Sequence, residues 1–298
     1  MAEIVEILPK KEKESDVRLV SNNVLCQCLA GNRESKKIRR TAQLFDAYAD
    51  LDADFFTLQE VDELWYTDYK LEELMKELGF ADVPAMGKGQ YVYLHTVDLR
   101  NPIFYKADRF ELIECGYDRY RATEFPARDN KKAPEYPSSS YVWGVFEEKA
   151  TGKKLAVFST HLVARVNQPN NTPEEKEKTK EEYHIESVMQ LADEMKRISE
   201  KYGCGVVAGG DYNHTPSAPA YAYMKQFFDS ARDECPVKLN TQYRTYTVFG
   251  KAPEICEGAI DHCMYTRHGI VAKRFEQSVC ERTWCYSDHI PVIFDFEI

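Results

Sequence analysis

Side chains that could bind a cation or transfer a proton stand at the ends of six short apolar runs, or directly beside them. They are the amides, carboxylates and imidazoles of Asn23, Glu60, His161, Asp211, Asn213, Asp261, Asp288 and His289. Carboxylate and amide oxygens suit Mg²⁺ or Mn²⁺, whereas a zinc site would need more His or Cys. The set therefore has the composition of a hard-cation site with general acid and base groups.

Each position also has a purely structural explanation. Glu60 could be a solvated strand end, and Asp211 with Asn213 could form an Asx turn after Gly209 and Gly210. Such explanations do not account easily for all six runs together. We therefore interpret the polar groups as converging at one edge of a sheet assembly.

Ten runs rich in β-branched and aromatic residues predict the strands that must position these groups. They span residues 18–25, 54–58, 102–105, 110–115, 141–146, 154–159, 205–208, 259–265, 271–275 and 290–296. Helical patterns occupy residues 37–48, 70–78, 173–202 and 219–228. Because some strands are joined by helices and others by short turns, the order favours two packed sheets with helices outside over a simple βαβ barrel.

Two segments carry more specific expectations. Thr172, Pro173 and Glu175 form a capping-box pattern that predicts the start of the longest helix. Residues 117–140 are polar, contain three prolines and show no periodicity, so they predict a long functional or mobile loop.

Charge and composition exclude several classes of protein. The 298 residues carry 39 Lys+Arg against 49 Asp+Glu, a net charge of −10, which disfavours a surface built to grip duplex nucleic acid but leaves a local basic cleft open. No apolar run approaches the roughly 20 residues of a membrane span. The start lacks the apolar region of a secretory signal, so we expect a cytoplasmic protein, unless a leader was removed. The nine cysteines predict reduced thiols.

Six segments resemble, in chain order, the signature blocks of the endonuclease/exonuclease/phosphatase family, which includes pancreatic-type deoxyribonuclease, abasic-site endonucleases, poly(A) deadenylases, inositol polyphosphate 5-phosphatases and bacterial sphingomyelinases. They are Asn23-Val24-Leu25, Leu58-Gln59-Glu60-Val61, Ser159-Thr160-His161-Leu162, Gly210-Asp211-Tyr212-Asn213-His214-Thr215-Pro216, Ile260-Asp261-His262 and Ser287-Asp288-His289-Ile290-Pro291-Val292. The pattern is most similar to the uncharacterised bacterial, deadenylase-like and sphingomyelinase-like branches. It covers nearly the whole chain, from about residue 17 to residue 296.

The resemblance implies an α/β (α+β) fold, a four-layer sandwich of two packed mixed sheets flanked by helices. With no repeat, linker or shift in composition, we expect a single domain over residues 17–298 after an N-terminal extension at 1–16. The resemblance further implies Mg²⁺-dependent hydrolysis of a phosphoester, with Mn²⁺ as the other suitable ion. Glu60 would be the principal metal ligand, assisted by Asn23 and Asp288.

The same resemblance assigns catalytic roles. Asp211 and Asn213 would hold the attacking water and the phosphate. His289, oriented by Asp261, would contact the phosphate or act as acid or base, and His161 would support the phosphate or the leaving group. Whether His289 or Asp211 takes the proton of the water stays open.

The expected partner is a phosphodiester, either single-stranded nucleic acid or a small molecule, and no obligate protein partner is indicated. Two alternatives remain: a phosphomonoesterase acting on a sugar or inositol phosphate, and a non-catalytic binding module that keeps the fold. Arg165, Asn167, Tyr120 and Arg121 are candidates for substrate binding, as are Trp65 and Tyr69. Arginines interleaved with aromatic rings can bind phosphates and stack bases, but the same residues could pack against the core.

Overall fold

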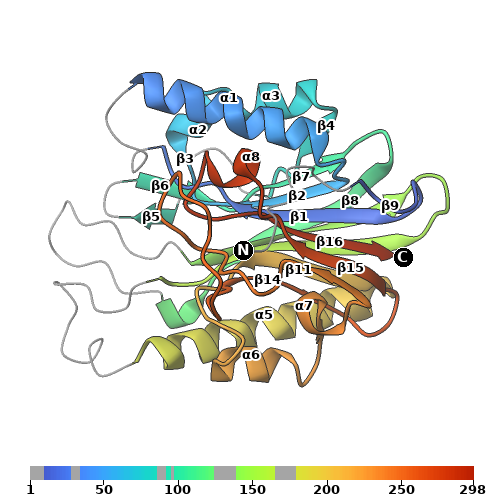
Figure 1. The fold of residues 1–298 in the computed structure, drawn as a ribbon. Coiled ribbons are helices and arrows are strands. Elements are labelled where there is room, and N and C mark those ends of the chain that lie inside the picture. The colour runs from blue at the N-terminus through green and yellow to red at the C-terminus, as the bar shows by residue number, and fades with distance from the viewer. Residues whose placement is uncertain (1–9, 28–33, 86–91, 95–96, 124–138, 165–178) are drawn as a thin grey trace, which may run out of the picture.

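The computed structural model describes residues 10–27, 34–85, 92–94, 97–123, 139–164 and 179–298. Its larger sheet has the order β13-β15-β16-β1-β2-β7-β4, and its second sheet the order β12-β14-β11-β10-β9-β8. A small third sheet has the order β3-β6-β5. Figure 1 shows the two large sheets packed face to face.

The strands of the seven-stranded sheet are β1 (Val17–Asn23), β2 (Phe55–Gln59), β4 (Phe80–Asp82), β7 (Ile103–Lys106), β13 (Val237–Leu239), β15 (Val271–Gln277) and β16 (Val292–Glu297). Those of the six-stranded sheet are β8 (Phe110–Arg119), β9 (Ser140–Glu148), β10 (Lys154–His161), β11 (Gly205–Asp211), β12 (Asp229–Ser230) and β14 (Asp261–Tyr265). The third sheet contains β3 (Val61–Asp62), β5 (Val92–Leu94) and β6 (Val97–Arg100).

Alternate residues of the central strands enter different cores. In β10, Leu155 and Val157 face the core between the two sheets, whereas Ala156 and Phe158 face the helices outside. Successive side chains of a strand point to opposite faces, so a strand buried on both faces is apolar at every position. This is why these strands read as continuous apolar runs in the sequence.

Helices cover both outer faces of the sandwich (Figure 1). The seven-stranded sheet packs against α1 (Glu34–Asp50), α2 (Glu63–Thr67), α3 (Leu71–Glu77) and the short α8 (Glu281–Trp284). The six-stranded sheet packs against α5 (Lys180–Tyr202) and α6 (Pro219–Met224), while α7 (Ala231–Glu234) follows β12 and the 3₁₀ turn η1 (Arg121–Thr123) follows β8. The four-layer sandwich expected from the sequence is therefore confirmed.

All ten strands predicted from the sequence are present, and the short strands β3, β4, β5, β6, β12 and β13 were missed. These have two to four residues each, too few for a periodic signal. Within the described residues, no helix combines the length and apolar character needed to cross a membrane. Every described cysteine is a free thiol.

Two boundary predictions were wrong. The predicted helix is not continuous over residues 173–202: the part that ends at Tyr202 begins at Lys180, with extended Thr179 as its N-cap and Glu182 completing the capping box. The same Thr-x-x-Glu signature occurs twice, and the copy next to the buried helix face is the one that caps the described helix, because tertiary packing supplies most helix stability. Thr172 and Glu175 lie outside the described residues.

The second correction concerns the expected loop at 117–140. Strand β8 continues to Arg119, where it pairs with Ser140 of β9. Backbone pairing with a neighbouring strand does not require apolar side chains, so the polar sequence concealed this part of the strand. Residues 124–138 lie outside the described residues.

Two glycines near the carboxyl end of β11 allow close approaches, Gly209 to the opposite sheet and Gly210 to the neighbouring strand β10. A Cβ atom on Gly209 would lie 2.7 Å from Thr57 Oγ1 in the opposite sheet. A Cβ atom on Gly210 would lie 2.1 Å from the carbonyl oxygen of Thr160 in β10. Gly209 therefore allows the two sheets to present their strand ends to one site, and Gly210 allows the close pairing of β11 with β10.

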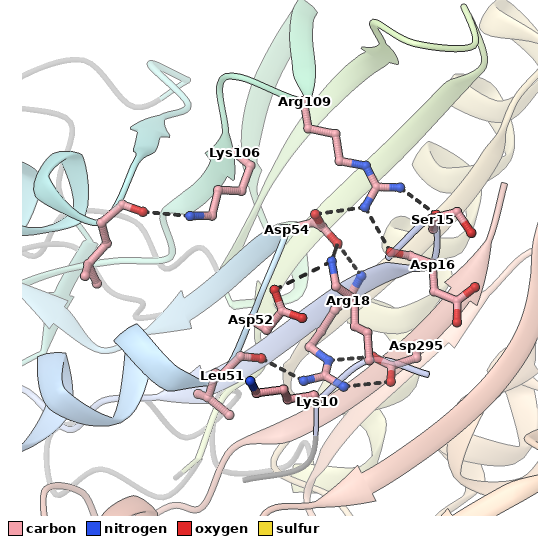
Figure 2. A network of polar contacts seen from close by, with 12 residues as sticks. Lys10, Ser15, Asp16, Arg18, Leu51, Asp52, Asp54, Lys106, Arg109 and Asp295 are labelled. Carbon is pink, nitrogen blue, oxygen red and sulfur yellow. Dashed lines mark hydrogen bonds and ion pairs between the residues drawn. The ribbon is translucent and has the colours of Figure 1, made fainter. Parts of the chain in front are cut away.

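A network of buried ion pairs ties the other end of β1 to the fold (Figure 2). The guanidinium of Arg18 donates to both carboxylate oxygens of Asp295, at 2.7 and 2.9 Å, and to the Leu51 carbonyl. Arg109 donates to Asp54 and to backbone carbonyls of Ser15 and Asp16. Residues 10–16, expected to form an extension, thus contact the sandwich at this end.

We expect Gly210→Ala to lower the free energy of unfolding by at least about 2 kcal/mol, because the added methyl group must displace the Thr160 carbonyl from its strand. Gly152→Ala is the control: it has a φ of 69° but open space around it, so it should cost only about 1 kcal/mol. Urea unfolding of both variants measures the two costs. Equal losses would contradict the close approach at Gly210.

Candidate functional site

The strand pairing brings the predicted site residues to one end of the sandwich. Asn23 ends β1 and Glu60 follows β2, which runs parallel to it. His161 ends β10 and pairs with Asp211 at the end of the parallel strand β11. Asp211 in turn pairs with Asp261, the first residue of the antiparallel β14. Parallel strands from both sheets therefore end together at this site.

The amide of Asn23 connects the two sheets. Its Nδ2 donates to Glu60 Oε1 at 3.1 Å and to Asp211 Oδ2 at 3.0 Å. Its Oδ1 accepts from the backbone N–H of Leu25 at 3.0 Å, which holds the orientation of the amide. Asn23 is fully buried, so these contacts keep two carboxylates from opposite sheets next to each other.

His289 lies between two carboxylates. Its Nδ1 donates to Asp261 Oδ2 at 2.9 Å, and its Nε2 lies 3.7 Å from Asp211 Oδ2. Burial alone would lower the pKa of this histidine, but the charges of Asp261 and Asp211 outweigh burial and raise its pKa well above the ordinary value. The ring is therefore held as an imidazolium that could donate a hydrogen bond or a proton.

Two further predicted residues surround the Asp211 carboxylate. His161 Nε2 lies 3.6 Å from Asp211 Oδ2, and neither ring nitrogen of this buried histidine has a hydrogen-bond partner among the described residues. The backbone N–H of Asn213 donates to Asp211 Oδ1 at 2.9 Å, and its side chain donates to the Leu162 carbonyl at 2.8 Å. Asn213 therefore supports Asp211, and His161 has free ring nitrogens beside it.

The backbone is strained at two site residues. Glu60 has a φ of 58° and Asn213 a φ of 53°, in the left-handed region that favours glycine. For a residue with a side chain this conformation costs on the order of 1 kcal/mol, and it persists where the surroundings over-determine it. Here the hydrogen bonds to Asn23 and Asp211 hold both turns.

The negative charge of the site fits a cation. Burial, followed by the charges of Glu60 and Asp211, raises the pKa of Asp288. Ligand atoms of Asp211, Asp261 and His289 lie within 4.8 Å of one another, and His289 already uses Nδ1 for its hydrogen bond to Asp261. Glu60 and Asp288 add two half-buried carboxylates whose charges interact with each other and with Asp211.

The residues proposed for substrate contact have different locations. Tyr120 is fully buried, packs on Tyr141 and shares a hydrogen bond with Thr160, so its ring belongs to the core. Trp65 and Tyr69 are buried in the core as well, which is the packing alternative that the sequence left open. Arg121 is exposed. Arg165 and Asn167 lie outside the described residues.

Residues that the sequence did not single out also border the site. Thr245 Oγ1 accepts from the backbone N–H groups of Ile260 and Asp261, at 2.9 and 3.1 Å, and its carbonyl accepts from Ile290. It therefore joins the segments that carry Asp261 and His289. Tyr246 is 43% exposed, and its ring meets the His289 ring edge-on, with centroids 5.1 Å apart. Both lie in an irregular segment with no periodic signal.

Three buried histidines form a layer beside Asp211. The His214 ring lies 5.4 Å from that of His184 and 5.7 Å from that of His262. His184 donates to the Val163 carbonyl and His262 to the His214 carbonyl, at 2.8 and 2.9 Å. Burial lowers the pKa of both His184 and His262 to about 4. The rings are therefore neutral and support the two loops that carry the site.

This layer predicts a loss of stability in acid. An unfolded histidine binds a proton below about pH 6.5, whereas the pKa of folded His262 is about 4. As the pH falls from about 6.5 to about 4, proton binding therefore favours the unfolded state and lowers the free energy of unfolding. Glutamine does not bind a proton in this range, so His262→Gln lacks this contribution to the pH dependence of stability. We expect the stability difference between wild type and variant to shrink by about 2 to 3 kcal/mol from pH 7 to pH 4. Urea unfolding at several pH values measures this, and a constant difference would refute it.

Comparison with known proteins finds similarity only in three dimensions. No family model and no curated protein matches the sequence. An endonuclease/exonuclease/phosphatase from Bacteroides vulgatus superposes with a TM-score of 0.72 at 20% identity, over 96% of this chain and 100% of that one. A Bacteroides thetaiotaomicron mannosyl-6-phosphatase gives 0.69 at 19% identity, over 95% and 100%. The catalytic domain of human Nocturnin gives 0.68 at 17% identity, over 96% of both chains.

All three matches extend over almost the whole of both chains, which includes both sheets and the strand ends that carry the site. Identities of this size establish the architecture and not the activity. The protein has the endonuclease/exonuclease/phosphatase fold.

Proposed function

We propose that the protein is a divalent-metal-dependent phosphoesterase that hydrolyses a phosphodiester by attack of water. The observation that carries this proposal is the position of His289, held as an imidazolium between Asp261 and Asp211. An anionic phosphoester repels nucleophiles, so its hydrolysis requires positive charge on the phosphate and a base near the water. The site offers both within one group of contacts.

Glu60 and Asp288 would hold the metal, and Asn23 would keep the Glu60 carboxylate in place through its amide. A bound Mg²⁺ or Mn²⁺ supplies a Lewis acid that offsets the negative charge of the phosphate. Both carboxylates are half-buried, and Asp288 already carries a raised pKa, so the donor set gains stability from a cation.

The remaining roles follow from the contacts. Asp211 Oδ2 faces His161 and His289, at 3.6 and 3.7 Å, and can orient a water and accept its proton. Asn213 holds the other oxygen of this carboxylate. His289 can donate to a phosphate oxygen, with Asp261 fixing its tautomer, and the free nitrogens of His161 can support the phosphate or the leaving group.

Substrate class is the finer part of the proposal. The acidic chain favours single-stranded nucleic acid or a small phosphodiester over a long duplex. A phosphomonoester of a sugar is the second candidate, since one protein with this fold is described as a mannosyl-6-phosphatase. Lys180 supports this candidate because it interacts with the charge of Asp211 from the first turn of α5.

Asp211→Asn should abolish turnover while leaving the fold intact, because the amide cannot accept the proton of the water. The assay is product formation with Mg²⁺, Mn²⁺ or EDTA on single-stranded RNA and DNA, an abasic duplex, an aryl phosphodiester, sugar and inositol phosphates and sphingomyelin. Asp193→Asn, an exposed aspartate on α5, is the matched control and should retain full activity. A fully active Asp211→Asn protein would refute the assignment.

If no substrate of the panel gives product and metal does not raise the melting temperature, the non-catalytic alternative is favoured. If no product forms but metal does raise the melting temperature, the site binds metal and the substrate is a phosphoester outside the panel. The two readouts together therefore separate loss of chemistry from a wrong choice of substrate.

Asp261→Asn tests the role of His289. Removing the carboxylate should lower the pKa of His289, because Asp261 provides the leading raising influence on that ring. We expect kcat to fall by roughly 10²- to 10⁴-fold, the range of general acid–base catalysis. NMR titration of the imidazole in EDTA and the pH dependence of kcat measure the two effects. An unchanged His289 pKa would disprove the coupling.

A further inference from the structure

Arg40 is a buried cation behind the proposed metal site. It lies on α1 in a basic run with Lys36, Lys37 and Arg39, yet only 1% of its surface is exposed. Its spacing from Leu44, the next buried apolar residue of α1, is four positions, which places both on the face that packs against the sheet. A buried guanidinium needs several acceptors, and these reveal what it holds.

The acceptors of Arg40 are backbone carbonyls of segments that adjoin site residues. Nη1 donates to the carbonyls of Val24 and Tyr286, and Nη2 donates to the Leu25 carbonyl at 2.8 Å. Nε donates to Gln27 Oε1 at 3.3 Å. Val24 and Leu25 directly follow Asn23, and Tyr286 stands two residues before Asp288.

Two peptide groups connect Arg40 to site residues by hydrogen bonds at both of their polar atoms. The carbonyl of Val24 accepts from Arg40, and the N–H of the same peptide, on Leu25, donates to Asn23 Oδ1. The carbonyl of Leu25 accepts from Arg40, and the N–H of that peptide, on Cys26, reaches Glu60 Oε2 at 3.4 Å. In a trans peptide the C=O and N–H point in opposite directions. Fixing the carbonyls therefore aims both N–H groups at the site.

The backbone between these peptides is in a strained conformation, which increases the need for an anchor. Leu25 has a φ of 55°, an unfavourable value for a residue with a branched side chain. Trp65 adds a second anchor: its Nε1 donates to the Leu25 carbonyl at 3.3 Å, and its ring lies 4.7 Å from the Arg40 guanidinium carbon. The turn after β1 is thus held by one guanidinium and one indole.

The hydrogen bond from Arg40 to the Tyr286 carbonyl also fixes the segment that carries Asp288 and His289. Beyond that carbonyl, Ser287 Oγ donates to the Asn23 carbonyl at 2.7 Å and accepts from the His289 N–H at 3.2 Å. The positive charge of Arg40 also interacts with Asp288 and Glu60. One side chain therefore joins the segments of Asn23, Glu60 and Asp288.

We propose that Arg40 is a positioning residue that sets the metal affinity of the site by orienting the Val24–Leu25–Cys26 peptides toward Asn23 and Glu60. The inference rests on the proposed metal-dependent function. Arg40 touches neither metal nor substrate, so its loss should weaken metal binding without removing a catalytic group. Activity should consequently return at high metal concentration, which it cannot do in Asp211→Asn.

The experiment compares Arg40→Lys with Arg18→Lys. Each change keeps a positive charge but removes the planar fork of donors, and both arginines are buried. Arg18 is bound to Asp295 and Leu51 at the opposite end of β1, as Figure 2 shows, so it controls for the general cost of the substitution. Calorimetric titration with Mn²⁺ and with Mg²⁺ gives the affinity, and urea unfolding in EDTA gives the stability.

We expect Arg40→Lys to bind Mn²⁺ at least tenfold more weakly than wild type, with kcat near the wild-type value at saturating metal. The Mn²⁺ affinity of Arg18→Lys should stay within twofold of wild type, even if its free energy of unfolding falls as much as that of Arg40→Lys. Trp65→Phe, a milder change to the same turn, should weaken binding about threefold, and it decides the question if Arg40→Lys does not fold.

The possible failures are distinct. A wild-type protein that binds no metal overturns the proposed function and this inference with it. A wild type that binds metal, together with Arg40→Lys or, if that does not fold, Trp65→Phe binding equally well, overturns the role of Arg40 and leaves the proposed function standing. Weakening of the same size in Arg18→Lys would also overturn it, because the effect would then be general.

Discussion

The contact between the paired parallel strands of the two sheets determines where everything else in the site can lie. β1 and β2 in one sheet and β10 and β11 in the other end at the same edge, and Gly209 lets them approach closely there. The Asn23 amide then bonds to a carboxylate from each sheet. A strand shifted by one residue would turn its side chains to the opposite face and break these contacts, so the site requires the observed register.

Buried negative charge is the main energetic problem of this arrangement. Asp211 and Asp261 are buried and lie close to the half-buried Glu60 and Asp288, and their removal from water makes these charges costly. The chain offsets part of the cost with the Asn23 amide, the imidazolium of His289 and, one layer behind, the guanidinium of Arg40. The remaining excess of carboxylate is what a divalent cation would neutralise, so the same charges that oppose folding favour metal binding.

The layers behind the site hold the strained turns that carry its residues. Thr245 fixes the start of β14, and the neutral histidines His184 and His262 hold neighbouring loop carbonyls. Loops and strand ends lack the internal hydrogen bonding of a regular element, so side-chain contacts must supply the rigidity that catalysis needs. The opposite end of β1 is held by the Arg18 network instead (Figure 2). Stability and chemistry are thus supported at separate ends of the same strand.

The sequence by itself determined the ten longer strands, the four longest of the described helices and the residues that end the strands, but not the short helices α2, α7 and α8. Burial on both faces produces continuous apolar runs, and polar groups stand out where such runs stop. It also indicated the four-layer architecture. Only the tertiary structure decided which polar groups face one another, that the long helix starts at Lys180, and that Tyr120 belongs to the core. Arg40 shows the reason. In the sequence it looks like an ordinary solvent-exposed arginine, but in the fold it is buried because the carbonyls of Leu25 and of the distant Tyr286 accept its hydrogen bonds. Contacts between distant segments have no signature in local sequence.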